Sequence, residues 1–598
     1  MPATLNAPEV RAILDDARRL RPLRTLTPSP DDWRDCWIYF LMVDRFNNPM
    51  APPRTPFDGK CGGFQGGTLD GIRAQLDYLK ALGVGAIWFT PVLANCQDLD
   101  GQPNEGTYHG YGIQNFLDID RRFAADPRDP AGELRRLIDA AHARGIYVIL
   151  DIVLNHTGDV FAYPAGSQAP FSANPYAVQW RDADGRARPD WPIGEQIAAP
   201  GADAAVFPDE LRRNDFFRRQ GTPQAGGPDT VGDFSSLKQL LSADHEVGNV
   251  LIRIFQYLIA AYDVDGFRID TLKYLDQDFA LRFGNAIREF ALSVGKKNFF
   301  TYGEVYDDEQ KISQYIGRNV SASGDLVGVD ASLDFPLFFR LPSVLKGLAP
   351  PSEVVSMYQV RKAVEKNVIS SHGEATRFFV TFLDNHDQHT RFYFQDPAKP
   401  EAFDDQLTMG MACLFALPGI PCLYYGTEQG LHGSGDSDQN VREALWGKPN
   451  AFDSAHPFYQ ALQRIHRVRS EQPALRYGRF YFRPLSGNGV QFGVSPYAGG
   501  VLAFSRILND QEVVVVANTS SAARFAGWIV VDSNLSPAGT QFDILLSNQA
   551  APLAPAPVST SGPADIHEVD GSVSGGPTCM VAVDLAPMEI QILGHQPL

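Results

Sequence analysis

Cysteine is scarce in this chain, and so are long apolar runs. There are six cysteines in 598 residues and none forms a CxxC pair, which argues against a disulfide framework or a structural zinc site. No stretch reaches the roughly 18 apolar residues that a membrane span needs. The first twenty residues carry charges where a signal peptide would have an apolar run. We therefore expect a cytoplasmic protein, the alternative being a secreted one whose leader has been removed.

Basic residues are also fewer than acidic ones. Lys plus Arg number 52 against 70 Asp plus Glu, and the formal net charge is -18. This balance argues against nucleic acid or an anionic membrane as a partner, because a phosphate-rich surface would be repelled. It suits a neutral substrate. The sequence does not indicate an oligomeric state.

What the chain does contain is a globular composition with a repeating pattern. The hydrophobic fraction is 44%, and the length predicts two or three domains. Apolar runs of strand length alternate with amphipathic segments. Two of these segments predict helices, one over 68–82 and one that begins at Gly132. Strands that are apolar on both faces and separated by helices are typical of a parallel sheet. Eight such runs occur, at 37–43, 86–92, 146–154, within 251–270 (ending in GFRID), and at 298–305, 329–335, 377–385 and 419–426.

Eight strands are the number found in a (β/α)8 TIM barrel. A doubly wound open sheet is the alternative, but no GxGxxG or GxxxxGK[ST] motif follows an early strand, so the barrel is favoured. We also expect no organic cofactor. Flanking segments complete a four-part division. It comprises an N-terminal helical extension (1–30), the barrel (31–156 and 241–474), a subdomain inserted after strand 3 (157–240) and a C-terminal antiparallel β-sandwich (475–598).

Polar residues interrupt the apolar runs where four of the strands end. The third run contains Asp151 and leads into Asn155 and His156, and the fourth ends in Arg268 and Asp270. The fifth run leads into Glu304, and the seventh into Asn385, His386 and Asp387. In a barrel the carboxyl ends of the strands form one face, which is where active sites lie.

Two of these carboxyl groups are predicted to differ in charge state. Arg268 and Asp270 are two residues apart and share a strand face, so the guanidinium is expected to lower the pKa of Asp270 and keep it ionised. Glu304 follows an apolar run, where partial burial and nearby anions favour the protonated acid. A nucleophile paired with a proton donor is the arrangement that glycoside hydrolysis uses.

The motifs DIVLNH (151–156), GFRIDTLKY (266–274), GEV (303–305) and FLDNHD (382–387) occur in this order at strand ends. Together they resemble the four signature regions of the α-amylase superfamily, glycoside hydrolase family 13. GTYHGYG (106–112) and GIPCLYYGTE (419–428) add to the resemblance, which runs from about Cys36 to Tyr477. Four motifs in register are far more specific than any one alone.

The resemblance implies a role for each matching residue. Asp270 would be the nucleophile, Glu304 the general acid and base, and Asp387 a third acid that grips sugar hydroxyls. Arg268 would orient the nucleophile. The other expected substrate contacts are His156, His386, Tyr111, Asp151, Asn385 and Lys273. The implied reaction cleaves α-1,4-glucosidic bonds of maltooligosaccharides or α-glucans with retention, through a covalent β-glucosyl-enzyme, and places the two carboxyl groups about 5–5.5 Å apart.

The resemblance also implies a calcium ion that joins the insert to the barrel. Its ligands here would be the side chains of Asn155 and Asp233 and the backbone carbonyl of Tyr274. Calcium takes six to eight oxygen ligands, and the motifs supply only these three.

Three other functions stay open at this point. A transglycosylase would use the same intermediate with a sugar acceptor in place of water. A non-catalytic scaffold that binds sugar or protein would usually lack one of the three carboxylates. A metal-dependent barrel hydrolase is suggested by His109, His156, His386 and His389, although the usual HxH after the first strand is missing.

Overall fold

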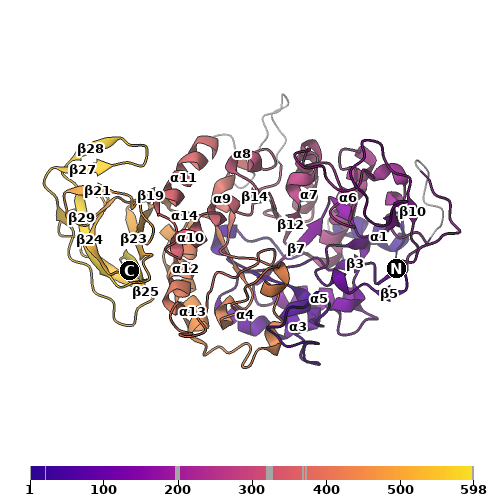
Figure 1. Cartoon of the computed structure of the whole chain (residues 1–598), viewed down its shortest axis with the longest axis horizontal. Coiled ribbons are helices and arrows are strands. Elements are labelled where there is room, and N and C mark those ends of the chain that lie inside the picture. The colour runs from indigo at the N-terminus through magenta and orange to yellow at the C-terminus, as the bar shows by residue number, and fades with distance from the viewer. Residues whose placement is uncertain are drawn as a thin grey trace.

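The computed structural model describes residues 2–19, 22–194, 203–317, 328–365, 369–370 and 373–595. Its centre is a sheet of eight parallel strands in which neighbours follow chain order (Figure 1). A bridge between Leu333 and Val380 joins the two outer strands and closes the sheet into a barrel. The strands are β1 (Ile38–Leu41), β2 (Ala86–Phe89), β7 (Tyr147–Val153), β12 (Gly266–Asp270), β13 (Phe300–Gly303), β14 (Ala331–Ser332), β17 (Val380–Thr381) and β18 (Ile420–Tyr424). The predicted barrel is confirmed.

Helices surround the barrel because each presents one apolar face to the sheet. The helix predicted over 68–82 is two segments, α3 (Leu69–Ala74) and α4 (Leu76–Leu82), which meet at Gln75. Thr68 caps the first by accepting from the Gly71 N–H, and Gly83 ends the second in a left-handed conformation that favours glycine. The other long helices are α5 (Pro130–His142), α6 (His245–Tyr262), α7 (Gln277–Ser293), α11 (Ser352–Glu365), α12 (Asp404–Ala416) and α13 (Pro457–Glu471).

The chain leaves and re-enters the barrel through one small antiparallel pair. β8 (His156–Thr157) follows β7 and pairs with β11 (Lys238–Gln239), which precedes α6. Between them the chain is mostly irregular, with a short pair formed by β9 (Phe161–Ala162) and β10 (Gln179–Trp180). Phe161, Trp180 and Phe217 form an edge-to-face aromatic cluster with ring centroids 5.2–5.8 Å apart. These aromatic residues continue the buried core of the barrel into the insert.

Two sheets follow the barrel, at the yellow end of the chain (Figure 1). The last short helix, α14 (Pro473–Tyr477), leads into them. The first sheet has the order β19 (Arg479–Phe482), β22 (Val501–Leu508), β23 (Gln511–Asn518), β30 (Ile590–Gly594) and β25 (Asp543–Ser547). The second has the order β26 (Ser559–Thr560), β29 (Cys579–Leu585), β24 (Phe525–Val530), β20 (Leu485–Ser486), β21 (Gln491–Gly493), β27 (Ala564–His567) and β28 (Val573–Gly576).

These sheets form the predicted sandwich, with a separate buried cluster that includes Val514, Val516 and Val581. All strand pairs in them are antiparallel except β21 with β27, which run parallel. The exact boundaries of the four domains stay a prediction. Within the part of the chain that the structure describes, no helix is both long and apolar enough to cross a membrane.

The N-terminal segment is attached to the barrel at the amino ends of the strands. α1 (Pro8–Ala17) buries Val10 and Leu14 and packs on α6. Farther along, the backbone N–H of Thr27 donates to Asp263, which lies just before β12. Asp263 and Asp265 both contact the buried ammonium of Lys296 at 2.7 Å. His142, at the end of α5, completes the cluster with a 2.8 Å contact to Asp265.

This cluster makes stability depend on pH. Burial opposes the charged form of His142, but hydrogen bonds to Asp263 and Asp265 raise its pKa from 6.5 to about 9. A pKa that is higher in the folded state stabilises the fold below pH 6.5, and that stability is lost as the pH rises through 9. The shift corresponds to up to about 3 kcal/mol. We predict that the free energy of unfolding falls between pH 6.5 and 9, measured by urea denaturation.

The variant His142→Gln should flatten that slope and unfold at lower urea concentration at pH 6. The exposed His567 provides a matched control, and His567→Gln should leave the slope unchanged. An identical pH slope in His142→Gln and the unmodified chain would contradict the assignment.

Candidate active site

Strand register brings the polar residues of β7, β12 and β13 together. β12 pairs in parallel with β7 so that Arg268 lies opposite Asp151, and its other neighbour is β13, which Glu304 follows. Arg268 and Asp270 alternate with apolar residues on β12 and therefore share a face. The sequence prediction that these side chains meet at the carboxyl ends of the strands agrees with this register.

Arg268 is the centre of the site. Its guanidinium is almost fully buried and donates to Asp270 at 2.8 Å, to Glu304 at 2.7 Å and to both oxygens of Asp151 at 2.9 and 3.1 Å. One cation thus joins three carboxyl groups from three strands. Charge-assisted bonds of this kind fix orientation as well as charge. The side chains of Asp270 and Glu304 are 10% and 20% exposed, so neither is fully buried.

Asp151 supports the site from beneath. It also accepts hydrogen bonds from Trp88 Nε1 at 3.0 Å and from the Tyr111 hydroxyl at 2.9 Å. The Tyr111 hydroxyl in turn lies 2.8 Å from Nε2 of His386. Tyr111 therefore links two parts of the site through its hydroxyl, in addition to the flat ring that the sequence suggested. Trp88 was missed because it lies within an apolar run that reads only as a buried strand.

The predicted lowering of the Asp270 pKa is wrong. Burial raises the pKa of Asp270 well above its usual range; Arg268 opposes this, and the charges of Glu304, Asp151 and Asp387 add to it. Burial likewise raises the pKa of Asp151 to about 6, against the effect of Arg268. The sequence showed one cation beside Asp270 but not that several carboxyl groups share it. The free site therefore favours retaining a proton among them.

Thr271 connects the two carboxyl groups nearest the cleft. It has φ of 49°, a left-handed conformation that is rare for a β-branched residue. In this conformation its backbone N–H donates to Glu304 at 3.1 Å, while its hydroxyl donates to Asp270 at 3.2 Å. The strained turn places a donor between Asp270 and Glu304.

Asp387 lies across the cleft and is more accessible, with its side chain 45% exposed. Asn385 accepts from the Asp387 N–H at 2.9 Å and so shapes the turn that carries it. Arg442 approaches Asp387 at 3.2 Å and also donates to the His386 carbonyl and the Tyr108 hydroxyl, each at 2.9 Å. Arg442 was missed because it lies in an irregular loop. Its position after the eighth strand was the only available signal.

A cleft of about 550 Å3 opens above these groups. It also exposes an aromatic surface that sequence reasoning missed. Tyr306 is 53% exposed and packs against Phe335 and Phe339, with ring centroids 4.9 Å away in each case. The cleft is lined by Glu304, Tyr306, Phe335, Asn385, Asp387, Gln388, His389 and Thr390.

Two further predicted contacts have different surroundings. His156 is buried, with its ring 5.9 Å from that of Phe234, and burial lowers its pKa to about 4. Lys273 is paired with Asp307 at 3.3 Å and with Asp229 of the insert at 3.7 Å. Lys273 thus joins the insert to the loop after β13, and its role as a sugar contact stays a prediction.

The residues expected to hold calcium do not fit the ion. Asn155 Oδ1 accepts from the amide nitrogen of Gln239 at 3.3 Å, which places a donor beside the oxygen a cation would need. Asp233 accepts from the Tyr163 hydroxyl and from the Gln239 N–H. The ring of Tyr274 packs edge-on against Phe234 at 4.6 Å.

A lysine supplies the positive charge in this region. The side chain of Lys238 is fully buried, and its ammonium lies 3.8 Å from both Asp159 and Asp233. It also donates to the Ser167 carbonyl. These contacts argue against the expected ion at Asn155 and Asp233, because an ammonium already lies beside the carboxylates. The expected role of the Tyr274 backbone carbonyl stays a prediction. In the described ranges, no three His, Cys, Asp or Glu side chains are grouped as a metal site would require.

The fold and the site define a class. This is a (β/α)8-barrel protein with a carboxylate cluster around one arginine at the carboxyl ends of the strands. Residues 40–473 match the family model of the α-amylase catalytic domain. The chain belongs to the α-amylase family.

Curated relatives are similar over most of this chain. An α-amylase of Streptomyces lividans is 28% identical across 78% of this chain and 52% of its own length. A β/α-amylase of Paenibacillus polymyxa is 28% identical across 87% of this chain and 36% of its own length. The chain thus spans about half or less of these two relatives.

Solved structures share the fold. An α-amylase of Geobacillus thermoleovorans, complexed with acarbose, gives a TM-score of 0.63 at 23% identity and covers 94% of this chain and 99% of its own. CldA, a cyclomaltodextrin glucanotransferase with a three-domain arrangement, gives 0.65 at 22% identity, with coverage of 94% and 99%.

Lys238 leads to a prediction about metal dependence. Adding a chelator or calcium should leave the thermal unfolding midpoint of the unmodified chain unchanged, because the carboxylates already have a cation. Lys238→Met should lower stability by roughly 3–5 kcal/mol, since it leaves the buried carboxylate of Asp233 without its cation, whereas Asp159 keeps an ion pair with Arg181 at 3.6 Å. The exposed Lys399 offers a matched control in Lys399→Met. Scanning calorimetry provides the measurement, and a midpoint that falls with chelator and recovers with calcium would refute this reading.

Proposed function

We propose that the chain is a retaining α-glycoside hydrolase that cleaves α-1,4-glucosidic bonds of maltooligosaccharides or α-glucans. The observation that carries the proposal is the guanidinium of Arg268, which binds both Asp270 and Glu304. Two carboxyl groups on one guanidinium are close neighbours. Retaining enzymes keep their carboxyl groups about 5–5.5 Å apart, whereas inverting enzymes hold them at about 6.5–9.5 Å to admit a water.

The proposed chemistry uses two displacements at the anomeric carbon. Glu304 donates its proton to the glycosidic oxygen while an Asp270 oxygen bonds to the anomeric carbon, so the leaving sugar departs as an alcohol. Glu304 then takes a proton from water, whose oxygen replaces Asp270 at that carbon. Arg268 balances the negative charge that moves between the two carboxyl groups.

Several groups suit a neutral, hydroxyl-rich ligand. Among the described residues, the buried Nε2 of His156 and Nδ1 of His386 have no hydrogen-bond partner, and sugar hydroxyls would satisfy both. Asp387 is accessible enough to accept from two hydroxyls. Tyr306 offers an exposed ring on which a sugar face can stack. The names of the relatives agree, since they are called α-amylases and one solved structure holds acarbose.

A test of the nucleophile starts with Asp270→Asn, which keeps the shape of the side chain but removes the charge. Hydrolysis of maltooligosaccharides, followed as released reducing ends, should fall by roughly 10^4-fold or more, as expected when one member of a catalytic unit is lost. The exposed Asp570→Asn is the matched control and should retain full activity. Proton NMR of the first product of the unmodified chain should show the α anomer. Unchanged turnover in Asp270→Asn, or a β anomer formed first, would sink the proposal.

Transglycosylation is the second candidate function. It is favoured by the structural likeness to a cyclomaltodextrin glucanotransferase and by the aromatic surface of Tyr306 and Phe339, which could hold an acceptor sugar beside Glu304. A non-catalytic scaffold is disfavoured because all three carboxylates line or border the cleft.

Incubation with concentrated maltotriose separates hydrolysis from transfer. We expect glucose and maltose as the main products under the hydrolase reading, measured by chromatography. Products longer than maltotriose as the major fraction would instead establish transfer, and Tyr306→Ala should then reduce their share.

A further inference from the structure

A second cavity lies at the end of the barrel opposite to the carboxylate site. Arg34 precedes β1, Arg377 precedes β17 and Gly419 precedes β18, so these residues mark the amino ends of the strands. The other walls come from α11, α14, β19 and β22, where the barrel meets the C-terminal sheets. The cavity encloses about 270 Å3, near the lower limit for small-molecule sites.

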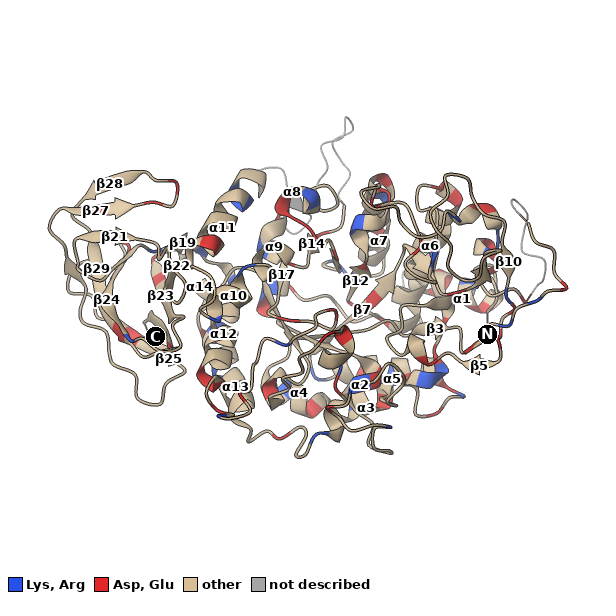
Figure 2. Cartoon of the chain, in the orientation of Figure 1, with Lys and Arg blue, Asp and Glu red and all other residues tan. Residues whose placement is uncertain are grey.

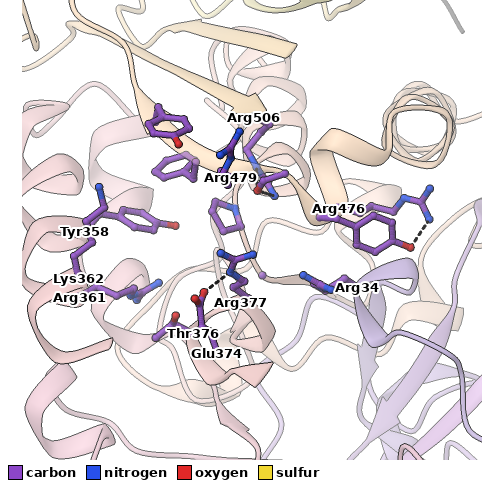
Figure 3. Close-up of a pocket in the computed structure, with 16 residues that line it drawn as sticks. Arg34, Tyr358, Arg361, Lys362, Glu374, Thr376, Arg377, Arg476, Arg479 and Arg506 are labelled. Carbon is purple, nitrogen blue, oxygen red and sulfur yellow. Dashed lines mark hydrogen bonds and ion pairs between the residues drawn. The ribbon is translucent and has the colours of Figure 1, made fainter. Parts of the chain in front are cut away.

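Positive charge dominates the lining. Among the residues that the structure describes, Glu374 is the one acidic residue that contributes to it. Figure 3 shows the cationic side chains approaching from several sides, with Tyr358 and Arg361 on one wall and Arg479 and Arg506 on another. The outer helices of the molecule instead carry both signs of charge interspersed (Figure 2). The cavity cations are Arg34, Arg361, Lys362, Arg377, Arg476, Arg479 and Arg506.

Four of these cations already have carboxylate partners. Arg34 is paired with Asp32, Arg361 with Asp334 and Glu309, Arg377 with Glu374, and Arg476 with Asp35. Lys362, Arg479 and Arg506 have no such partner in the described part of the chain. Three cations of the lining thus keep a positive charge that a phosphoryl group, with about −1.5 to −2 charges at neutral pH, would offset.

Arg506 is a buried cation of the lining without a carboxylate partner among the described residues. It is 2% exposed and donates only to carbonyls, those of Ala416 at 2.7 Å and Gly478 at 3.1 and 3.3 Å. Behind it, Arg469 is also buried and also bonds only to carbonyls. Burial lowers the pKa of Arg506 to about 9, and the charge of Arg469 contributes. Two buried guanidinium groups without a carboxylate favour an anion nearby.

Lys362 and Arg479 differ from Arg506 because they are exposed and have no ion-pair partner in the described part of the chain. They lie at the rim, where a ligand would enter. Arginine forks bind phosphoryl oxygens in bidentate fashion, and such bonds strengthen in a partly enclosed site. Tyr358, Tyr477 and Tyr481 add aromatic surface for an organic portion of the ligand.

We propose that this cavity binds a small phosphorylated molecule, with its phosphoryl group held by Arg377, Arg479 and Lys362. The enclosed volume suits a small molecule better than a macromolecule, and the net charge of -18 disfavours nucleic acid. The site is separate from the carboxylate cluster. Binding at this cavity can therefore be tested independently of the proposed glycosidase activity.

Isothermal titration calorimetry at fixed ionic strength tests the proposal on the full chain. The probes are inorganic pyrophosphate, glucose 6-phosphate and adenosine triphosphate, with glucose as the uncharged reference. We expect saturable binding of at least one phosphate probe. The double variant Arg479→Gln with Lys362→Gln should bind it at least tenfold more weakly. Arg11→Gln changes an exposed arginine on α1 and should leave the affinity unchanged.

The relative affinities of the probes and of the variants distinguish the possible ligands. Tighter binding of an organic phosphate than of pyrophosphate identifies an organic ligand, whereas equal affinities identify the phosphoryl group alone; both support the site. Asp270→Asn should keep full affinity for the probe, which separates this site from the active site. No saturable binding of any phosphate probe, or equal affinity in the double variant and the unmodified chain, overturns the proposal.

Discussion

The active site depends on a single buried cation. Arg268 compensates Asp151, Asp270 and Glu304, which come from three neighbouring strands, and it can do so only because barrel closure sets those strands in parallel register. Leaving a buried carboxylate unpaired is costly, so the guanidinium and the carboxyl groups constrain one another. The same arrangement also shifts the pKa values of these carboxyl groups. Burial raises the pKa of Asp270 and of Asp151, and Arg268, which is shared among several carboxyl groups, opposes this only in part.

Buried carboxylates elsewhere are also balanced by the chain's own cations. Lys296 neutralises Asp263 and Asp265 at the amino end of β12, and Lys238 does the same for Asp159 and Asp233 where the insert meets the barrel. An ammonium is a single charge on a flexible stem and contacts fewer oxygens than calcium does. It needs no external ion, however. The junction between insert and barrel is thus built from covalently attached charges.

Sequence reasoning succeeded where a signal is local. Each barrel strand is a short apolar run, and Asp270, Glu304 and Asp387 follow such runs directly, so both the fold and the cluster could be predicted. It failed where position depends on tertiary contacts. Arg442 and Tyr306 lie in loops without periodicity. The direction of the Asp270 pKa shift depends on how many carboxyl groups surround one cation. In the sequence, Lys238 has no feature that distinguishes it from a surface lysine, and only the fold buries it beside Asp233.

The two ends of the barrel therefore differ in their electrostatic balance. At the carboxyl ends, acidic groups outnumber the cation; at the amino ends, cations outnumber the acids. Arg506, on β22, helps attach the C-terminal sheets by donating to the Ala416 carbonyl of α12, whereas Arg469, on α13, donates to carbonyls of Phe415 and Gly419 within the barrel. Among the described residues, neither buried guanidinium has a carboxylate partner. An anion bound beside them would lower that electrostatic cost in the folded state only. By linkage, such a ligand would stabilise the junction between the barrel and the sheets in proportion to its affinity.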